Sequence, residues 1–469
     1  MEHTILSQSP THIGLLSWLV CSFSTPMYRT RMARSSPQAP ALPDLANLLN
    51  QGCYCHTLDR AQLEHLIGMD AGLRSMALRL ERTHPHLFSS TAVFLSQAMY
   101  QSMVETIGAL ERTMALPGWQ AYAMRDAPAV AQVQHGPQGV FMGYDFHISS
   151  QGPMLIEINT NAGGALLCAA LARAQTRCCK DMQFPVLDYR TLDGLDDDFV
   201  AMFHQEWRLQ RGDKALKTIA IVDDDPASQY LAPEFEMLCA LLSRRGYQAL
   251  VVDAKDLQYS DQTLSAPALD QASGRIPVDL VYNRLTDFML AEDRHADLAR
   301  AYAAGDVVVT PHPHAHALRA NKQHLVTLSH AQALEELGVG EQDRATLARA
   351  VPAAEHVTAD NADALWQKRA GYFFKPLDGF GARAVYRGDK ITRKVWEHVC
   401  QGNYLAQAVV PPAVRALELQ GNLMALKFDV RAYTYQGHIL LLSARTYQGQ
   451  ATNFRTQGGG FAPVVLVGT

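Results

Sequence analysis

Hydrophobic and polar positions divide the chain into a helical beginning and a remainder rich in strands. Between residues 45 and 116, apolar residues recur at intervals of three and four, which is the period of amphipathic helices. From residue 140 the period changes to two. The alternating segments 140–146 and 154–159 flank a polar turn, and this arrangement predicts a β-hairpin. A glycine-containing turn then leads into an Ala- and Leu-rich stretch at 165–174, which predicts another helix.

The middle of the chain has short, uninterrupted apolar runs instead of alternation. Runs at 218–222, 249–252 and 279–282 are typical of buried strands, and the segment 233–245 between the first two has a helical pattern. Strand, helix and strand at this spacing predict a parallel sheet covered by helices. The unit lacks the glycine fingerprint of a dinucleotide-binding turn, so we do not expect NAD to bind there.

Strands dominate the last third of the sequence. They are predicted at 371–376, 384–387, 404–410, 426–435 and 438–445. A glycine-rich loop at 453–460 follows them. With 469 residues the chain is too long for one small core, so we expect an α/β fold with α+β character and several domains. The predicted divisions are a flexible extension at 1–44, a helical region with the hairpin at 45–195, a parallel α/β domain at 196–320 and a strand-rich region at 321–469.

Composition and charge exclude several classes of protein. The chain has 41 Lys and Arg against 46 Asp and Glu, and the net charge of −5 disfavours a general nucleic-acid binder. Its eight cysteines are scattered, and a chain of this length needs no disulfide scaffold, so we expect reduced thiols. No apolar run is long enough to span a bilayer, and the apolar patch at 13–20 has no Lys or Arg before it, unlike a secretory signal. We therefore expect a cytoplasmic protein with no membrane or nucleic-acid partner.

Polar residues of the predicted hairpin form the first candidate site. Glu157 and Asn159 are two positions apart on one strand, so their side chains share a face, and Asp145 on the partner strand can face the same side. Carboxylate and amide oxygens are hard ligands that suit Mg²⁺ held together with phosphates. The alternative is an exposed polar strand face without a ligand.

Two lysines form the second candidate site. Lys375 stands directly before the turn Asp378-Gly379-Phe380-Gly381, and Lys322 follows the predicted parallel unit. Glycines let backbone N–H groups approach phosphate oxygens, and a lysine on a strand adds a positive charge. Taken alone, the pattern also fits an ordinary β-hairpin and a surface lysine. The alternating His312, His314 and His316 could form a metal site, although we favour a connecting loop.

Taken together, the motifs resemble a known family. The segments Phe374–Gly381, Tyr404–Gln407 and Asp429–Arg431, with Arg445, Asn453 and the glycines at 458–460, resemble the ATP-grasp core of glutathione synthetase. The family's last piece, an Asp followed by Glu-x-Asn, occurs here early, as Gly143-Tyr144-Asp145 and Ile156–Thr160. This order is circularly permuted, and the eukaryotic type of glutathione synthetase shows a similar order. The resemblance spans about residues 140 to 465 and implies a circularly permuted ATP-grasp fold with a parallel substrate domain.

The resemblance implies a role for each matching residue. Lys322 and Lys375 would contact the phosphates of ATP, and Lys375, Arg431 and Arg445 would act in catalysis near an acyl phosphate. The other implied roles are Mg²⁺ ligation by Asp145, Glu157 and Asn159; nucleotide contacts by Asp378, Gly379, Gly381, Gln407, Ala408 and Val409; a mobile lid formed by Gly458, Gly459 and Gly460; and substrate contacts by Arg284, Asn161 and Asn453.

The implied reaction joins a carboxylate to an amine at the expense of ATP. The carboxylate attacks the γ-phosphate to give an acyl phosphate, and the amine then displaces phosphate. The expected cofactors are ATP and Mg²⁺, the expected partners are a small-molecule acid and an amino acid or peptide amine, and a homodimer is compatible with the sequence. Two alternatives stay open: a ligase for another amino-acid or peptide substrate, and a nucleotide-binding scaffold or sensor without turnover.

Overall fold

The structure of the protein, a computed structural model, describes residues 44–176, 186–187, 192–268, 274–377, 384–450, 452–453 and 456–468. All of these belong to one compact unit, 43–469. The predicted extension at 1–44 lies outside the described residues except for Asp44. The predicted divisions at 195 and 320 stay predictions. Within the described ranges, no helix combines the length and apolar character that crossing a membrane requires.

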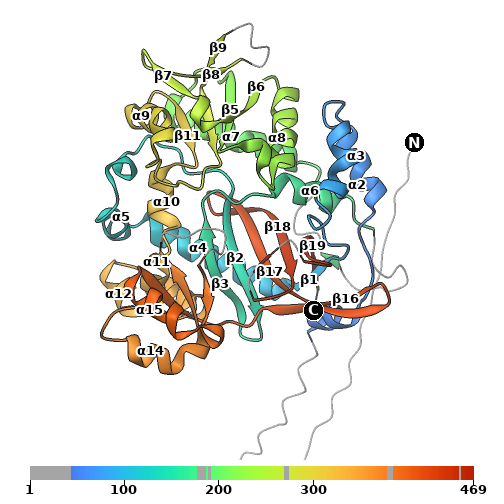
Figure 1. Ribbon diagram of the computed structural model, residues 1–469, viewed down its shortest axis with the longest axis vertical. Coiled ribbons are helices and arrows are strands. Elements are labelled where there is room, and N and C mark those ends of the chain that lie inside the picture. The colour runs from blue at the N-terminus through green and yellow to red at the C-terminus, as the bar shows by residue number, and fades with distance from the viewer. Residues whose placement is uncertain are drawn as a thin grey trace, which may run out of the picture. The chain divides into compact units, whose positions relative to one another are not determined.

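A large sheet joins the early hairpin to the last strands of the chain (Figure 1). Its strands follow the order β1-β19-β18-β17-β2-β3, with β16 paired to β17 and β4 paired to β19. Their bounds are β1 Val93–Ser96, β2 Met142–Ser149, β3 Gly152–Asn159, β4 Val186–Leu187, β16 Ala413–Leu419, β17 Asn422–Tyr435, β18 His438–Tyr447 and β19 Gly460–Val467. The antiparallel pairing of β2 with β17 places Asp145 directly opposite Arg431. Segments far apart in sequence therefore form one continuous surface.

The predicted hairpin is confirmed as β2 and β3. Its register places Asp145 opposite Glu157 and Gly143 opposite Asn159, and a register shift after Asp145 marks a β-bulge. A short turn follows and leads into α6 (Ala165–Arg173), the helix expected at 165–174. The residue before α6 is Gly164 with φ 101°, a backbone conformation that favours glycine.

The N-terminal region is helical, but a strand interrupts it. The helices are α1 Leu45–Gly52, α2 Arg60–Gly68, α3 Arg74–Thr83, α4 Gln97–Ala115 and α5 Pro117–Met124. The prediction of helix throughout 45–116 is wrong at 93–96, where β1 pairs parallel with β19. Val93, Phe94 and Leu95 are all buried, and a β-branched and aromatic run of this kind fits a strand. The side chain of Ser96 then caps α4 by accepting a hydrogen bond from the Met99 N–H group.

The predicted parallel sheet is also confirmed, with the strand order β11-β10-β5-β6. The bounds in this region are β5 Thr218–Asp223, β6 Gln248–Asp253, β10 Leu280–Asn283 and β11 Val308–Thr310, with α7 Leu195–Arg211, α8 Ala232–Arg244 and α9 Ala296–Ala304 and a small sheet of β7 Gln258–Ser260, β8 Thr263–Pro267 and β9 Arg275–Pro277. The chain leaves β5 for β6 on one side and later returns to β10 on the other. Ligands of open α/β sheets bind beyond the carboxyl ends of strands at such a switch point.

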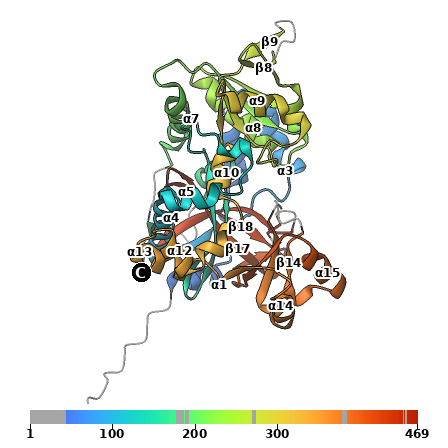
Figure 2. The ribbon, with the colours of Figure 1, turned by 90° about the vertical axis from the view of Figure 1, so that its left-hand side faces the viewer.

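A smaller antiparallel sheet carries Lys375, one of the two lysines of the second candidate site. Its order is β12-β15-β13-β14. The bounds are β12 Ala354–His356, β13 Tyr372–Pro376, β14 Tyr386–Arg387 and β15 Tyr404–Ala408, with α14 Ala362–Lys368 and α15 Arg393–Gln401, and the connection from the parallel domain contains α10 Pro313–Arg319, α11 His324–Leu328, α12 Ala331–Glu336 and α13 Glu341–Ala350. Phe374 packs against Trp396 of α15 in the core of this layer. Figure 2 shows the layer, in orange, beside the large sheet.

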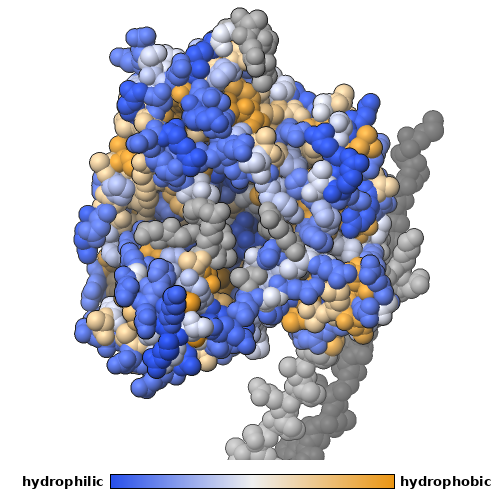
Figure 3. All heavy atoms as spheres, in the orientation of Figure 1, coloured by the Kyte–Doolittle hydropathy of each residue, from blue (hydrophilic) through white to orange (hydrophobic). Residues whose placement is uncertain are grey.

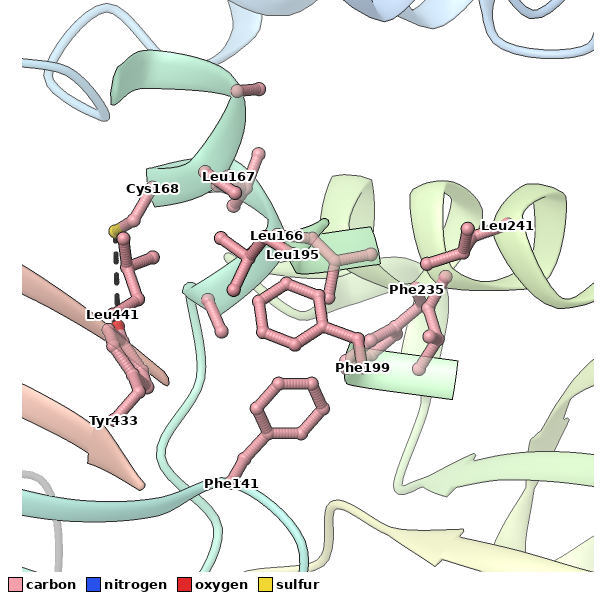
Figure 4. Packing of buried hydrophobic residues seen from close by; sticks show 14 of the residues in the cluster. Phe141, Leu166, Leu167, Cys168, Leu195, Phe199, Phe235, Leu241, Tyr433 and Leu441 are labelled. Atoms are coloured by element: carbon pink, nitrogen blue, oxygen red, sulfur yellow. Dashed lines mark hydrogen bonds between the residues drawn. The ribbon is translucent and has the colours of Figure 1, made fainter. Parts of the chain in front are cut away.

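Aromatic and aliphatic side chains join the helices of the parallel domain to the large sheet (Figure 4). Phe141, just before β2, packs edge-on against Phe199 of α7, with 5.1 Å between ring centroids. On the other side of α6, the Cys168 thiol lies 3.9 Å from the Tyr433 hydroxyl of β17. Burial raises the pKa of the Cys168 thiol to about 12, so it serves as a packing group and not as a nucleophile.

The surface view of the same face is largely hydrophilic (Figure 3). Apolar residues gather on it over the region of β16. The exposed large apolar side chains of the described residues include Val414 on β16 and Leu423 at the start of β17. The structure describes a single chain, so the expected homodimer stays a prediction.

Candidate active site

Lys375 connects the early hairpin to the smaller antiparallel sheet. Its side chain is buried, with 8% exposure, and its ammonium group donates a hydrogen bond to the Ile156 carbonyl oxygen at 3.1 Å. Lys375 lies on β13 and Ile156 on β3. The two stretches that the sequence marks as candidate sites therefore meet in the folded chain.

A second lysine lies beside this contact. The Lys322 ammonium is 3.5 Å from the Glu157 carboxylate. Burial lowers the pKa of Lys375 to about 8, Glu157 opposes that shift, and Lys322 adds to it. We call Lys322 and Lys375 the lysine pair. Two cations beside one carboxylate make the local charge positive, which favours an additional anion such as a phosphate.

Four charged residues form a separate group on the large sheet. Asp145 accepts hydrogen bonds from Arg431 at 2.6 and 2.7 Å and from Arg445 at 2.7 Å. Arg445 also donates to Asp429 at 2.7 Å. We call these four residues the charged quartet. Burial alone would raise the pKa of Asp145, but the two guanidinium groups outweigh burial and hold it at about 2.

The quartet changes the interpretation of Asp145. Both of its carboxylate oxygens are engaged by guanidinium groups, whereas the sequence assigns it to a metal ion. The Asn159 amide nitrogen also donates to Asp145 at 3.2 Å. Glu157 and Asn159 line the cleft described below, and the metal roles of Asp145, Glu157 and Asn159 stay predictions. Among the described residues, no group of three or more His, Cys, Asp and Glu side chains is arranged to hold a metal ion.

Sequence reasoning assigned no role to Asp429, although a signal for it exists. Asp429 and Arg431 are two positions apart on β17, so both point to the same face of the sheet. The register places Arg445 opposite Asp429, which completes the alternation of charge. The Thr452 hydroxyl donates a further hydrogen bond to Asp429 at 2.6 Å.

A cleft of about 270 Å³ opens between the hairpin, α10 and the loop after β10. It is lined by Glu157, Ile158, Asn159, Thr160, Asn161, Thr286, Asp287, Phe288, Met289, His316, Ala320, Asn321, Lys322 and Leu377. Four of the predicted site residues are therefore in one cavity: Glu157, Asn159, Asn161 and Lys322. The turn Asp378-Gly379-Phe380-Gly381 lies outside the described residues, but the preceding Leu377 borders this cleft.

An aromatic pair that the sequence did not predict lines the cleft. Phe288 stacks on His316 with ring centroids 4.0 Å apart and an interplanar angle of 7°. His316 also lies within 3.2 Å of the Thr160 hydroxyl. The neighbouring His312 and His314 bond to backbone carbonyls of Pro137 and Ala131, so the three histidines do not converge on one point.

Arg284 is placed behind the cleft, not in its lining. Its guanidinium group donates to the Asn161 carbonyl oxygen at 2.7 Å and lies over the ring of Tyr282. The Asn161 side chain in turn donates to the Leu285 carbonyl oxygen at 3.0 Å. The structure thus brings two of the predicted substrate residues together. Among the described atoms, the buried Nε of Arg284 has no hydrogen-bond partner.

Gln407, Ala408 and Val409 lie along and just after β15. The Ala408 and Val409 amides donate to Ala353 and Gly371 carbonyl oxygens at 2.8 Å, so both are used within the protein. Gln407 shares a face of its sheet with Lys375, and within the described part of the chain its buried amide nitrogen has no hydrogen-bond partner. This donor fits an acceptor on a nucleotide base.

The glycines at 458–460 form the approach to β19. The Gly458 carbonyl accepts a hydrogen bond from Ser89 at 3.2 Å, and a Cβ on Gly460 would lie 2.8 Å from the backbone of Phe88. Gly460 has φ 130°, so both space and backbone conformation require glycine there. Asn453 accepts a hydrogen bond from Thr456 through its carbonyl and is not in the cleft lining. The lid role of Gly459 and its neighbours stays a prediction.

The fold is similar to that of a solved glutathione synthetase-like protein. A glutathione synthetase-like effector from Globodera pallida, in its apo form, aligns with a TM-score of 0.51 and 12% identity over 81% of this chain and 90% of that one. A putative gamma-glutamylcysteine synthetase from Methylobacillus flagellatus aligns with a TM-score of 0.43 and 9% identity over 77% of this chain and 86% of that one. Comparison with protein-family models and with curated protein sequences finds no match.

Proposed function

We propose that the protein is an ATP- and Mg²⁺-dependent ligase that joins a carboxylate to an amine, with the motif order of a circularly permuted glutathione synthetase. One observation carries the proposal: the lysine pair and the oxygen ligands Glu157 and Asn159 meet beside a single cleft. Phosphoryl transfer needs cations placed around phosphate oxygens and hard oxygen ligands for the metal ion. Residues from different parts of the chain would meet both requirements.

The residues present fit a magnesium–nucleotide complex. Glu157 and the amide oxygen of Asn159 would hold Mg²⁺, Lys322 and Lys375 would hold phosphates, and Gln407 would donate to the base. When bound, the metal ion neutralises phosphate charge. The buried amide nitrogen of Gln407 is an independent sign of a missing acceptor, because buried donors are rarely left without one.

The chain's own residues would act mainly by positioning and by charge. The substrate carboxylate attacks the γ-phosphate of ATP, which gives an acyl phosphate and ADP, and the amine then attacks the acyl carbon and releases phosphate. Lys375 would stabilise charge on the transferred group, and removal of such a contact lowers rates by about 10²–10³. The charged quartet holds Arg431 and Arg445 rigidly on the neighbouring sheet face, so little reorganisation is needed during the reaction.

We further propose small-molecule partners, namely an amino acid or peptide and its acid co-substrate, and a cytoplasmic location. The roles of Asp378, Gly379 and Gly381 at the phosphates, of Ala408 and Val409 near the base, and of Gly458, Gly459 and Gly460 as a lid belong to the same proposal. So do the substrate roles of Asn161, Arg284 and Asn453.

A nucleotide-binding sensor without turnover is the second candidate. The engagement of both arginines by Asp145 and Asp429 favours it, because neither guanidinium is directed into the described cleft lining. A sensor would bind MgATP with the lysine pair and release no ADP.

The test is a screen for ADP release with amino acids, dipeptides and polyamines as substrates. A ligase requires release that depends on both an acid and an amine and that is lost in Lys375→Ala and Glu157→Ala. Lys394→Ala, an exposed lysine on α15, is the matched control and should keep full activity. Normal turnover by the two site variants would contradict the site. MgATP binding without ADP release across the whole panel would favour the sensor.

A further inference from the structure

The loop between β10 and α9 forms one wall of the cleft. Thr286, Asp287, Phe288 and Met289 line the cavity from this side. Phe288 reaches across to stack on His316 of α10. A loop with this position determines how much space a substrate finds beside the lysine pair.

His295, at the start of α9, contacts this loop through Asp287 but does not line the cleft. The side chain is fully buried, and both ring nitrogens bond to carboxylates: Nδ1 to Asp287 at 2.8 Å and Nε2 to Asp224 at 2.9 Å. Each ring nitrogen therefore lies at hydrogen-bond distance from a different carboxylate. Asp224 follows directly after β5, and the imidazole therefore bridges the cleft loop to the carboxyl edge of the parallel sheet.

Asp287 accepts hydrogen bonds from two other residues of the loop. Its carboxylate accepts the Glu292 amide at 2.8 Å, and its carbonyl accepts the Leu290 amide at 3.1 Å. Leu290 has φ 50°, an uncommon conformation for a residue other than glycine, which marks a tight reversal. Burial would raise the pKa of Asp287, but the backbone amides and His295 lower it. The Asp287 carboxylate thus links the loop backbone to the buried His295.

We propose that His295 is a positioning residue that fixes the cleft loop through Asp287 and so sets the affinity for the substrate that the cleft holds. The inference rests on the proposed function for its kinetic part. His295 is not among the residues that line the cleft, so it acts through Asp287 and not on the substrate.

Two isosteric variants separate the two hydrogen bonds. An asparagine amide nitrogen takes the place of Nδ1 and keeps the bond to Asp287, whereas a glutamine amide nitrogen takes the place of Nε2 and keeps the bond to Asp224. His295→Asn should therefore hold the loop better than His295→Gln. The matched control is His135→Gln, because His135 bonds to the Tyr302 carbonyl of the same domain and lies outside the cleft lining.

The first measurement is hydrogen–deuterium exchange of the ligand-free protein, which requires no substrate. In His295→Gln the peptide covering 284–292 should exchange at least about ten-fold faster, in His295→Asn less so, and in His135→Gln at the wild-type rate. The second measurement uses MgATP with the acid and amine that give the most ADP in the screen. His295→Gln should raise KM for one of these two by about ten-fold while kcat and the KM for ATP change less than two-fold.

The outcomes separate the two proposals. Unchanged exchange in His295→Gln, equal effects of the two isosteres, or a fall in kcat with constant KM would overturn the role of His295. Faster loop exchange without ADP release from any pair would refute the ligase and leave the structural part of the inference intact. If His295→Gln does not fold, His295→Asn and Asp287→Asn are compared in its place by the same exchange criterion.

Discussion

The charged quartet and the lysine pair lie close together but balance their charges differently. In the quartet, two carboxylates and two guanidinium groups alternate at hydrogen-bond distance, so each charge has a partner within the protein. At the lysine pair, burial lowers the pKa of Lys375 because its charged form is insufficiently compensated. In the first region each charge is paired within the protein, whereas the second has two ammonium groups beside one carboxylate. Buried ion pairs are costly to break, and a buried lysine with a strongly lowered pKa marks a candidate functional site.

The largest effect is expected from breaking the quartet. Asp145→Asn leaves two buried guanidinium groups without their shared carboxylate, and loss of one partner of a buried ion pair costs about 3–5 kcal/mol. Chemical denaturation of the wild-type and variant proteins measures the free energy of unfolding. A loss below about 1 kcal/mol would show that the quartet does not stabilise the fold.

Removing a charge from the lysine pair should raise the stability of the protein, whereas breaking the quartet should lower it. Lys375→Met removes a charge that is buried at a net cost, since a fall in pKa from 10.5 to about 8 corresponds to about 3 kcal/mol. The variant should therefore be more stable by up to this amount and lose ADP release by about 10²–10³. Between about pH 8 and 10.5 the wild-type protein should gain stability as pH rises, because the folded state gives up the proton first. Thermal unfolding across this range would show the rise in the wild type and its absence in the variant.

Acid should weaken the quartet selectively. The Asp145 pKa is about 2 in the folded protein and near 3.8 when unfolded, which corresponds to about 2 kcal/mol of stability at neutral pH. A lowered folded pKa means that this stability is present above about pH 4 and is lost as pH falls toward 2. The difference in unfolding free energy between wild type and Asp145→Asn should shrink over the same interval. A constant difference would contradict the assignment.

The smallest effect on stability is expected from a hydrogen bond that Asp429 accepts from a residue outside the quartet. Thr452→Val removes the hydroxyl that donates to Asp429, and one such hydrogen bond contributes about 1 kcal/mol. Arg445 still pairs with Asp429, so the quartet should persist. Urea unfolding of the wild type and the variant measures the contribution.

The sequence predicted the elements that local periodicity encodes. Hairpin β2–β3, helix α6 and the parallel strands were all readable because their apolar patterns match one secondary structure. Strand β1 was not, because four residues between helices are too short for periodicity, and pairing with β19 decides their conformation.

The candidate site was predictable in its membership more than in its contacts. Glu157 and Asn159 were found from residue type and spacing and Lys322 from the family resemblance, and the structure places all three in one cleft. The pairing of Asp145 with two arginines was not found, since strand order and register are properties of the folded sheet. The bridge made by His295 likewise depends on two loops that are separated by about 60 residues in sequence.

The pairing of β2 with β17 also affects the synthesis of the chain. Asp145 and Arg431 are 286 residues apart, so the hairpin leaves the ribosome long before the strand that completes its sheet. Until then one edge of β2 has unsatisfied backbone groups, and its apolar residues Tyr144 and Phe146 are uncovered, which is a condition that promotes aggregation. Contacts of such long range also slow folding. Protection by a chaperone would therefore matter for the nascent hairpin.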